Sequence, residues 1–185
     1  MKTVILGSIQ RHLALAQWLT EQVPAVEKAA RLFTGTIKKG NTVFFCGNGG
    51  SAADSQHLAA EIVVRFRKER KAMPAVSLTT DTSILTAVLN DYGPDKVFSR
   101  QLEALARRGD LLVAISTSGN SANVLAAVRR AKVLGVRTLG LLGGSGGKIR
   151  QACDLSLVIP SSVTANVQEM HILIGHIFCD LAENN

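Results

Sequence analysis

The segment 116–121 (STSGNS) carries five hydroxyl and amide side chains and is the strongest chemical signal in the sequence. It follows the apolar stretch 111–115 and precedes a stretch with the apolar spacing of a helix. Hydroxyls at a helix N-terminus add to its free N–H groups and positive dipole end, which together attract phosphate. The alternative is helix capping by Ser118 or Asn120, but a cap needs one such residue rather than five. We therefore predict a phosphate site without a lysine.

The glycine-rich turn 47–52 (GNGGSA) also lies between an apolar stretch and a helical one. Its letters fit the G-x-G-x-x-A fingerprint of dinucleotide-binding proteins, which requires an acidic residue about 20 positions on, after the second strand. Glu69 has nearly the required spacing but precedes the expected second strand, 75–78. Asp81 follows that strand but lies well beyond the required spacing. A nucleotide site and a purely structural turn stay open, but we expect glycines that let a sugar approach the main chain. The second glycine-rich loop, 143–147, is expected to be a flexible turn.

Two pairs of polar residues are candidates for acid–base or metal chemistry. His57 and Glu61 are four positions apart and share one face of the helix after the glycine turn. Gln168 and His176 are eight positions apart on the last predicted helix, about 80° around its axis. These spacings are weak evidence alone, because most such pairs are ordinary surface or core residues. The basic stretch 65–71 is expected to be a solvated helix end.

The elements that must position these residues are short apolar stretches, each followed by Gly, Ser or Thr and then an amphipathic helix. This alternation predicts βα units and a parallel sheet. The expected strands are 42–46, 75–78, 111–115, 137–142 and 155–159. The expected helices are 50–68, 82–90, 95–107, 121–134, 147–151 and 163–182.

Two helical segments precede this region, one over 2–22 and one that starts near Pro24 and ends before Gly40. They can cover one face of the sheet or pack against another subunit, and both uses stay open. We predict an α/β fold with a three-layer, doubly wound five-stranded parallel sheet and two leading N-terminal helices. One domain would span 1–185, with a helical extension (1–40) and an α/β core (41–185). Ligands of such sheets bind outside the carboxyl ends of the strands.

The composition fits a single globular domain that binds an anionic ligand. The 185 residues are 46% hydrophobic, but no stretch approaches the roughly 20 apolar residues of a membrane span, and no signal-peptide cleavage site is evident. The net charge of +7 comes with only 4% aromatic residues and no nucleic-acid-binding motif, so a phosphorylated small molecule explains it as well as DNA does. Three scattered cysteines, Cys46, Cys153 and Cys179, indicate buried thiols. We expect a cytoplasmic protein with no nucleic-acid or membrane partner.

Four segments, in order and at family-like spacing over essentially the whole chain, resemble the sugar isomerase (SIS) domain family. They are FFCGNGGSAADSQHLAAE, AVLNDYG, VAISTSGNSANV and ANVQEMHILIGH. Within that family they resemble the phosphoheptose isomerases, which convert sedoheptulose 7-phosphate to D-glycero-D-manno-heptose 7-phosphate for the ADP- or GDP-heptose of lipopolysaccharide. The resemblance implies an aldose–ketose isomerase that forms a homotetramer, builds its active sites from more than one subunit and carries one zinc ion per subunit.

The resemblance also implies roles for individual residues. Glu61 and His176 would be the acid–base pair of an enediolate mechanism. The zinc ligands would be His57, Glu61, Gln168 and His176. The substrate would be bound by Asn48, Gly49, Gly50, Ser51, Glu61, Asn90, Asp91 and Gln168, and its phosphate by Ser116, Thr117, Ser118 and Ser121.

The chain departs from some members of the family at Ala165, where they carry an acidic residue, so one substrate hydroxyl contact is lost or supplied otherwise. A related branch binds the bacterial replication initiator and is not an isomerase. That branch lacks the catalytic glutamate and the final histidine, which this chain keeps as Glu61 and His176. The segments SAADSQHLAA and TAVLND nevertheless lean toward it, so a non-catalytic adaptor is the alternative function. A sugar-phosphate-sensing module of the same fold is a third.

Overall fold

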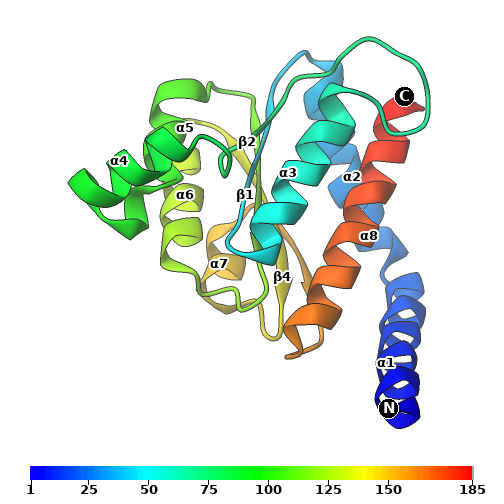
Figure 1. Ribbon diagram of the computed structural model, residues 1–185. Helices are drawn as coiled ribbons and strands as arrows, with labels where there is room; N and C mark the ends of the chain where they lie inside the picture. The colour runs from blue at the N-terminus through cyan, green and yellow to red at the C-terminus, as the bar shows by residue number, and fades with distance from the viewer. Residues whose placement is uncertain (185) are drawn as a thin grey trace.

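The computed structural model describes residues 1–184 and shows a five-stranded sheet with helices on both faces (Figure 1). The strands are β1 (Val43–Cys46), β2 (Ala75–Ser77), β3 (Leu111–Ser116), β4 (Arg137–Gly143) and β5 (Leu155–Ile159). Their order in the sheet is β2-β1-β3-β4-β5, and every neighbouring pair is parallel. The predicted doubly wound α/β fold is therefore confirmed, with its reversal of strand order between β1 and β3.

Helices cover both faces of the sheet. They are α1 (Lys2–Glu21), α2 (Val23–Lys38), α3 (Gly50–Val63), α4 (Thr82–Tyr92), the 3₁₀ helix η1 (Pro94–Lys96), α5 (Ser99–Leu105), α6 (Ala122–Val133), α7 (Gly147–Ala152) and α8 (Thr164–Glu183). One buried cluster joins the sheet to α2, α3 and α8, and a second joins its other face to the helices from α4 to α7. Phe45 of β1 belongs to the first cluster and its neighbour Phe44 to the second, because side chains alternate along a strand.

The two leading helices have different surroundings. Helix α2 buries Ala29 and Phe33 against the sheet, and the Phe33 ring stacks on Phe178 of α8 at a centroid distance of 5.3 Å. Helix α1 extends away from the body of the molecule (Figure 1) and leaves Val4 71% and Leu13 59% exposed. The first leading helix therefore carries an apolar face that this chain does not cover. Neither α1 nor any other helix within residues 1–184 is long and apolar enough to cross a membrane.

Most predicted boundaries agree with the structure within one or two residues, but two helices differ. The segment 95–107 divides into η1 and α5. The helix predicted over 50–68 ends at Val63. The reason for the second difference is a competing acceptor, because the backbone N–H groups of residues 66–68 donate to the carboxylate of Glu183 instead of to helical carbonyls.

The three cysteines are unpaired, as predicted. Cys46 and Cys179 are buried, and Cys153 is partly buried. Burial raises the pKa of the Cys153 thiol to about 11 and that of Cys179 to about 12. These thiols therefore stay protonated at neutral pH and act as small apolar side chains.

Candidate active site

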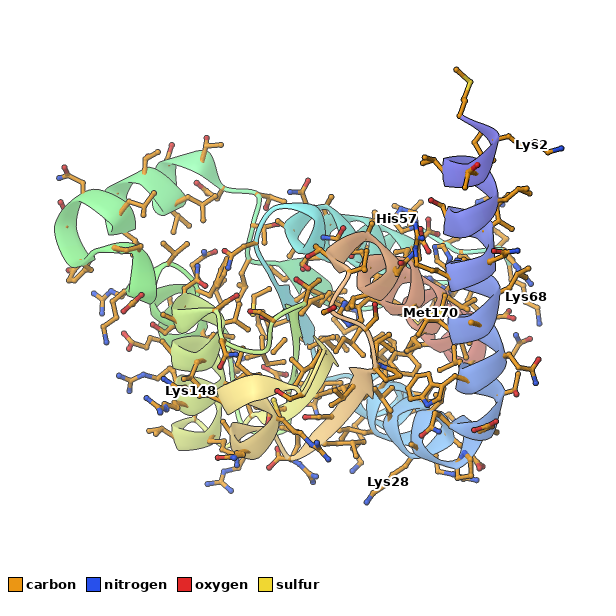
Figure 2. The ribbon with its side chains drawn as sticks, turned by 90° about the horizontal axis from the view of Figure 1, so that it is seen from below. Lys2, Lys28, His57, Lys68, Lys148 and Met170 are labelled. Carbon is orange, nitrogen blue, oxygen red and sulfur yellow. The ribbon has the colours of Figure 1, made fainter. Side chains whose placement is uncertain are left out.

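Three of the predicted acid–base and metal residues meet where α3 packs along α8. The Nε2 atom of His57 lies 2.8 Å from Nε2 of His176 and 3.6 Å from Oε1 of Glu61. Figure 2 shows His57 on the side of the molecule that α8 occupies, whereas Lys148 lies on the other side. The fold thus makes neighbours of His57 and His176, which are 119 positions apart in the sequence.

Two glycines allow α3 and α8 to approach closely enough for this contact. A Cβ atom at Gly175 of α8 would lie within 3 Å of the Leu58 side chain on α3. A Cβ atom at Gly50, in the first turn of α3, would overlap the carboxamide of Gln168. Gly50 therefore places the Gln168 amide beside the glycine turn, while Gly175 sets the separation of the helices beside His176.

The short distance between the two rings fixes their protonation relative to each other. At 2.8 Å one Nε2 must donate a hydrogen and the other must accept it. The pKa of His176 is lowered, mainly by burial and then by the charge of His57, while Glu61 acts in the opposite direction. His176 is therefore neutral at neutral pH and has a nitrogen that can exchange a proton with a ligand.

Asp54 is a functional candidate that the sequence reasoning missed. It precedes His57 by one turn of α3, and its Oδ2 atom is buried without a hydrogen-bond partner. Burial raises the pKa of Asp54, and His57 lowers it by a smaller amount. The three-residue spacing from His57 was the available signal, since residues three apart share a helix face.

The segment 116–121 connects β3 to α6, and the hydroxyls of Ser116, Ser118 and Ser121 bond within the segment rather than cap α6. Ser116 Oγ lies 3.0 Å from Ser121 Oγ, and Ser118 Oγ accepts a hydrogen bond from the Asn120 N–H at 3.1 Å. Ser121 occupies the N-cap position of α6 but makes no side-chain cap bond. The capping alternative for Ser118 and Asn120 is therefore wrong, and the N-terminus of a twelve-residue helix adjoins the loop.

The second glycine-rich loop, 143–147, was expected to be a flexible turn, and that expectation is wrong. Gly119 has a φ of +65°, and a Cβ atom there would overlap the backbone of Gly146. The Gly119 carbonyl accepts a hydrogen bond from the Ile149 N–H at 3.0 Å, and Asn120 Oδ1 accepts one from the Lys148 N–H at 3.1 Å. The 143–147 loop and the start of α7 therefore brace the hydroxyl-rich loop.

The first glycine turn lies beside the hydroxyl-rich loop at the carboxyl edge of the sheet. Cys46, at the end of β1, is in register with Ala114 of β3. Beyond the strands, the amides of Asn48 and Asn123 exchange two hydrogen bonds of 2.9 Å. Asn123 is a second residue that the sequence reasoning missed, although it lies two positions after the STSGNS motif. Of the predicted contacts in this turn, Asn48, Gly49 and Gly50 are exposed, whereas Ser51 is buried.

Asn90 and Asp91 are not brought to this site within one chain. They lie near the end of α4, which Figure 1 shows on the opposite side of the sheet from α3 and α8. Both residues are exposed, and Asn90 Nδ2 donates to Asp91 Oδ1 at 2.7 Å. The structure of one chain therefore does not place these two residues with the other predicted site residues.

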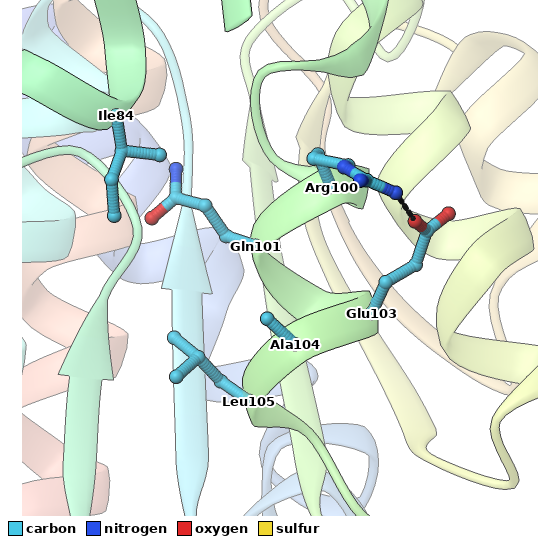
Figure 3. A pocket seen from close by; sticks show the side chains of 6 residues that line it. All are labelled: Ile84, Arg100, Gln101, Glu103, Ala104 and Leu105. Carbon is cyan, nitrogen blue, oxygen red and sulfur yellow. Dashed lines mark hydrogen bonds and ion pairs between the residues drawn. The ribbon is translucent and has the colours of Figure 1, made fainter. Parts of the chain in front are cut away.

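A cavity of about 380 Å³ lies between α4 and α5, and none of the residues that line it is a predicted site residue. Figure 3 shows its lining, which includes Ile84, Gln101 and Leu105. Arg100 donates to Glu103 at 2.9 Å on its rim. The Glu103 carboxylate is shared with Arg130, whose Nε lies 2.9 Å from Oε1. Because the lining includes none of the predicted site residues, we do not assign the site here.

The α3–α8 contact has the donor types that zinc prefers, namely two imidazoles and a carboxylate. The amide of Gln168 lies on α8, the helix that carries His176. Within the described part of the chain, however, no group of three His, Cys, Asp or Glu residues is already arranged around a metal position. Two nitrogens on one tetrahedral zinc lie about 3.3 Å apart when each bond is about 2.05 Å. His57 and His176 would therefore have to separate by about half an ångström.

Comparison with known proteins agrees with the sequence motifs and the fold. The family model of the SIS domain matches residues 10–143. A phosphoheptose isomerase of Aliarcobacter butzleri is 50% identical over 185 residues, which cover 100% of this chain and 98% of the relative. The structure of a phosphoheptose isomerase from Neisseria gonorrhoeae superposes with a TM-score of 0.93 at 41% identity, over 100% of this chain and 99% of that one. The structure of a phosphoheptose isomerase from Francisella tularensis superposes with a TM-score of 0.91 at 37% identity, over 100% of this chain and 96% of that one. The chain therefore belongs to the SIS domain family and, within it, to the phosphoheptose isomerases.

Proposed function

We propose that this isomerase converts sedoheptulose 7-phosphate to D-glycero-D-manno-heptose 7-phosphate and so supplies heptose for lipopolysaccharide. The observation that carries the proposal is the meeting of Glu61, His57 and His176 at the α3–α8 contact. The relatives named above are phosphoheptose isomerases. They do not favour the alternative of an adaptor that binds the replication initiator.

The arrangement suits a substrate whose phosphate and reacting carbons are at opposite ends. The hydroxyl-rich loop and the first turn lie together at the carboxyl edge of the sheet. His57 is seven residues after Gly50 on α3, which is about 10 Å along the helix axis. A phosphate bound by Ser116, Thr117, Ser118 and Ser121 would therefore leave the far end of the sugar for the acid–base residues.

In the mechanism we propose, Glu61 removes the proton from C1 of the open-chain ketose. The C1–H electron pair becomes the C1–C2 double bond, the carbonyl pair moves to O2, and His176 supplies a proton there. The O1 hydroxyl then loses its proton to His176, and Glu61 returns its proton to C2, which gives the aldose. General acid–base catalysis of this kind contributes about 10²- to 10⁴-fold in rate. The partly buried Glu61 side chain, 22% exposed, keeps the base out of bulk water.

We further propose one zinc ion per subunit, held by His57, Glu61, Gln168 and His176. When bound, zinc supplies a Lewis acid that stabilises negative charge on a substrate oxygen. The base role and the ligand role of Glu61 compete, since a carboxylate on a metal is a weaker base. Titration of the metal-free protein with zinc in a calorimeter tests the assignment. His57→Asn should abolish the binding isotherm, whereas His12→Asn should leave it unchanged.

The proposed homotetramer would complete the site. Two exposed features support it. The apolar face of α1 is not covered by the rest of the chain, and Asn90 and Asp91 on α4 lie apart from the other predicted site residues. Light scattering should give four times the 19.7 kDa chain mass. Mixed tetramers of the Glu61→Gln and Asp91→Asn chains should regain activity if sites are shared, because some sites then contain neither substitution. A monomer in solution would contradict the assembly.

We also propose that 1–185 is a single SIS domain and that the protein is cytoplasmic. The three unpaired thiols support a reducing compartment. A phosphorylated substrate accounts for the net charge of +7, so no nucleic acid or membrane is required as a partner.

The decisive experiment is a coupled assay with sedoheptulose 7-phosphate on the purified full chain. Turnover that saturates with substrate supports the isomerase. Binding of the sugar phosphate without turnover would instead select the sensing module. Absence of turnover together with tight binding to the replication initiator would select the adaptor.

A further inference from the structure

The segment 64–74, which connects α3 to β2, is held by one carboxylate from the last turn of α8. Glu183 accepts hydrogen bonds from the backbone N–H groups of Phe66 at 2.6 Å, Arg67 at 2.8 Å and Lys68 at 3.0 Å. The Glu183 side chain is 0% exposed. Figure 1 shows the connection crossing beside the C-terminal end of α8. The chain just after the C-terminal end of α3 is therefore tied to the C-terminal end of α8 by one buried carboxylate.

Arg70 links the same carboxylate to the backbone of the proposed base. Its Nε atom lies 3.3 Å from Glu183 Oε1, close enough for an ion pair although not aligned as a hydrogen bond. Its Nη2 atom donates to the Glu61 carbonyl oxygen at 2.8 Å. The Arg70 side chain is only 13% exposed, so the expectation that 65–71 is a solvated helix end is wrong at this residue.

Phe66 links the segment to the proposed acid. Its ring stacks on the His176 imidazole at a centroid distance of 5.3 Å and an interplanar angle of 25°. The Arg67 guanidinium lies 4.9 Å from the centre of the Phe66 ring and 3.6 Å from Asp180 Oδ2. The segment therefore presents a flat apolar surface to His176, whose Nε2 meets His57.

The Glu183 carboxylate is charged in this setting. Burial alone would raise its pKa, but the three backbone donors and Arg70 outweigh burial, and the pKa is lowered. A charged acceptor shared by three consecutive N–H groups is stronger than a neutral one. The contacts from this one carboxylate reach Phe66 and Arg70, and through them both proposed catalytic residues.

We propose that Glu183 is a positioning residue for catalysis: it fixes the segment 64–74 so that Phe66 orients His176 and Arg70 orients Glu61. This inference rests on the proposed function. It assigns a role to the last turn of α8 that neither the motifs nor the acid–base pair itself requires.

The test compares Glu183→Ala and Glu183→Gln with Glu69→Gln, a matched control in the same segment whose side chain is 88% exposed. Glu183→Ala should lower kcat by about 10-fold or more, with KM for sedoheptulose 7-phosphate within about twofold, because displacement of a reacting group costs rate. Hydrogen exchange of the amides of residues 66–68 should accelerate. Glu183→Gln, which keeps one acceptor oxygen, should be intermediate in both, and Glu69→Gln should match the wild type.

A second variant keeps the inference testable if Glu183→Ala folds poorly. Phe66→Leu should lower kcat in the same way, and Phe66→Leu combined with Glu183→Gln should lose little more than the worse single variant. Faster exchange at 66–68 with wild-type kcat per folded molecule would overturn the positioning role and leave the proposed function intact. A wild-type chain without turnover would overturn the proposed function, and this inference with it.

Discussion

The loop between β3 and α6 and the contact between α3 and α8 are built in different ways. The loop draws its polar groups from one contiguous segment, 116–121, and its close neighbour is the backbone of the 143–147 loop. The helix contact joins side chains that are 119 positions apart, and its geometry depends on how closely two helices pack. The first arrangement takes its polar groups from one segment and is braced by a neighbouring loop, whereas the second depends on the packing of two helices.

This difference predicts which kinetic constant, KM or kcat, depends on each region. Hydroxyls and N–H groups of the loop would bind the phosphate equally in the substrate and in the transition state. Such uniform binding affects KM more than kcat. The α3–α8 residues would act on protons that move only during the reaction, so changes there should affect kcat. Substitutions in each region test this division.

The largest effect is expected at the acid–base pair. Glu61→Gln keeps the size of the side chain but removes the base, so kcat should fall by at least about 10²-fold. His176→Gln should behave similarly, and the double variant should be far from additive, because both residues act on one transition state. The coupled assay gives kcat, and binding of inorganic phosphate should be unchanged.

The competing interpretation is that Glu61 and His176 are an ordinary packed pair. It predicts a lower melting temperature with normal turnover per folded molecule, so kcat and melting temperature must be measured on the same samples. Near-wild-type kcat in either single variant would remove that residue from the mechanism.

The next effect is expected from the spacing of the helices. Gly175→Ala places a Cβ within 3 Å of the Leu58 side chain, and overpacking of this kind costs about 1–3 kcal/mol. Since His176 is the next residue, kcat should also fall, by about 10-fold. Gly35→Ala is the control, because a Cβ at this position in α2 meets nothing within 4 Å. That variant should be as stable as the wild type or slightly more so. A stable, fully active Gly175→Ala protein would show that the close approach is not needed.

A smaller effect is expected at the hydroxyl-rich loop. Ser118→Ala removes one hydroxyl and should weaken binding of the phosphorylated substrate by about 1–2 kcal/mol, which is about 5- to 30-fold in KM. kcat should stay within about twofold. Ser145→Ala, in the neighbouring loop, is the control and should leave KM unchanged. A fall in kcat without a change in KM would break the division between the two regions.

The smallest effect is expected where α1 meets α8. Glu169 Oε2 lies 3.0 Å from His12 Nδ1, and this hydrogen bond is the main cause of the lowered pKa of Glu169. A carboxyl with a lowered pKa contributes stability above its unfolded pKa, about 4.3, and loses it as the pH falls through the folded value. Both side chains are more than 40% exposed, so Glu169→Gln should cost only a few tenths of a kcal/mol at pH 7.

The cost of Glu169→Gln should shrink as the pH falls below the unfolded pKa and should disappear below the lowered folded pKa, where the wild-type carboxyl is protonated as well. Thermal unfolding at pH 7 and at a series of lower pH values measures the difference. Glu21→Gln is the control, because residues 1–184 show no ion pair for Glu21. A cost that stays the same as the pH is lowered would show that packing, rather than charge, joins α1 to α8.

The sequence by itself determined the strands, the helices and the position of the polar loops. Apolar stretches bounded by Gly, Ser and Thr are a local pattern, so all five strands were predicted within one residue at either end. The rule that ligands bind at the carboxyl ends of parallel strands then placed the segment 116–121 and the turn 47–52 at one edge. The family resemblance predicted functional roles for His57, Glu61 and His176, because each lies in a short continuous motif that can be recognised in the sequence alone.

The tertiary structure alone decided which residues touch. No spacing rule shows that Gly175 fits against Leu58, or that Asn123 pairs with Asn48, because these contacts join segments far apart in the sequence. The early end of α3 had the same origin, since helix propensity is local whereas the competing acceptor, Glu183, lies more than 100 residues further along the chain. The helix was therefore predicted five residues too long, because a distant buried carboxylate binds the backbone N–H groups that would have extended it.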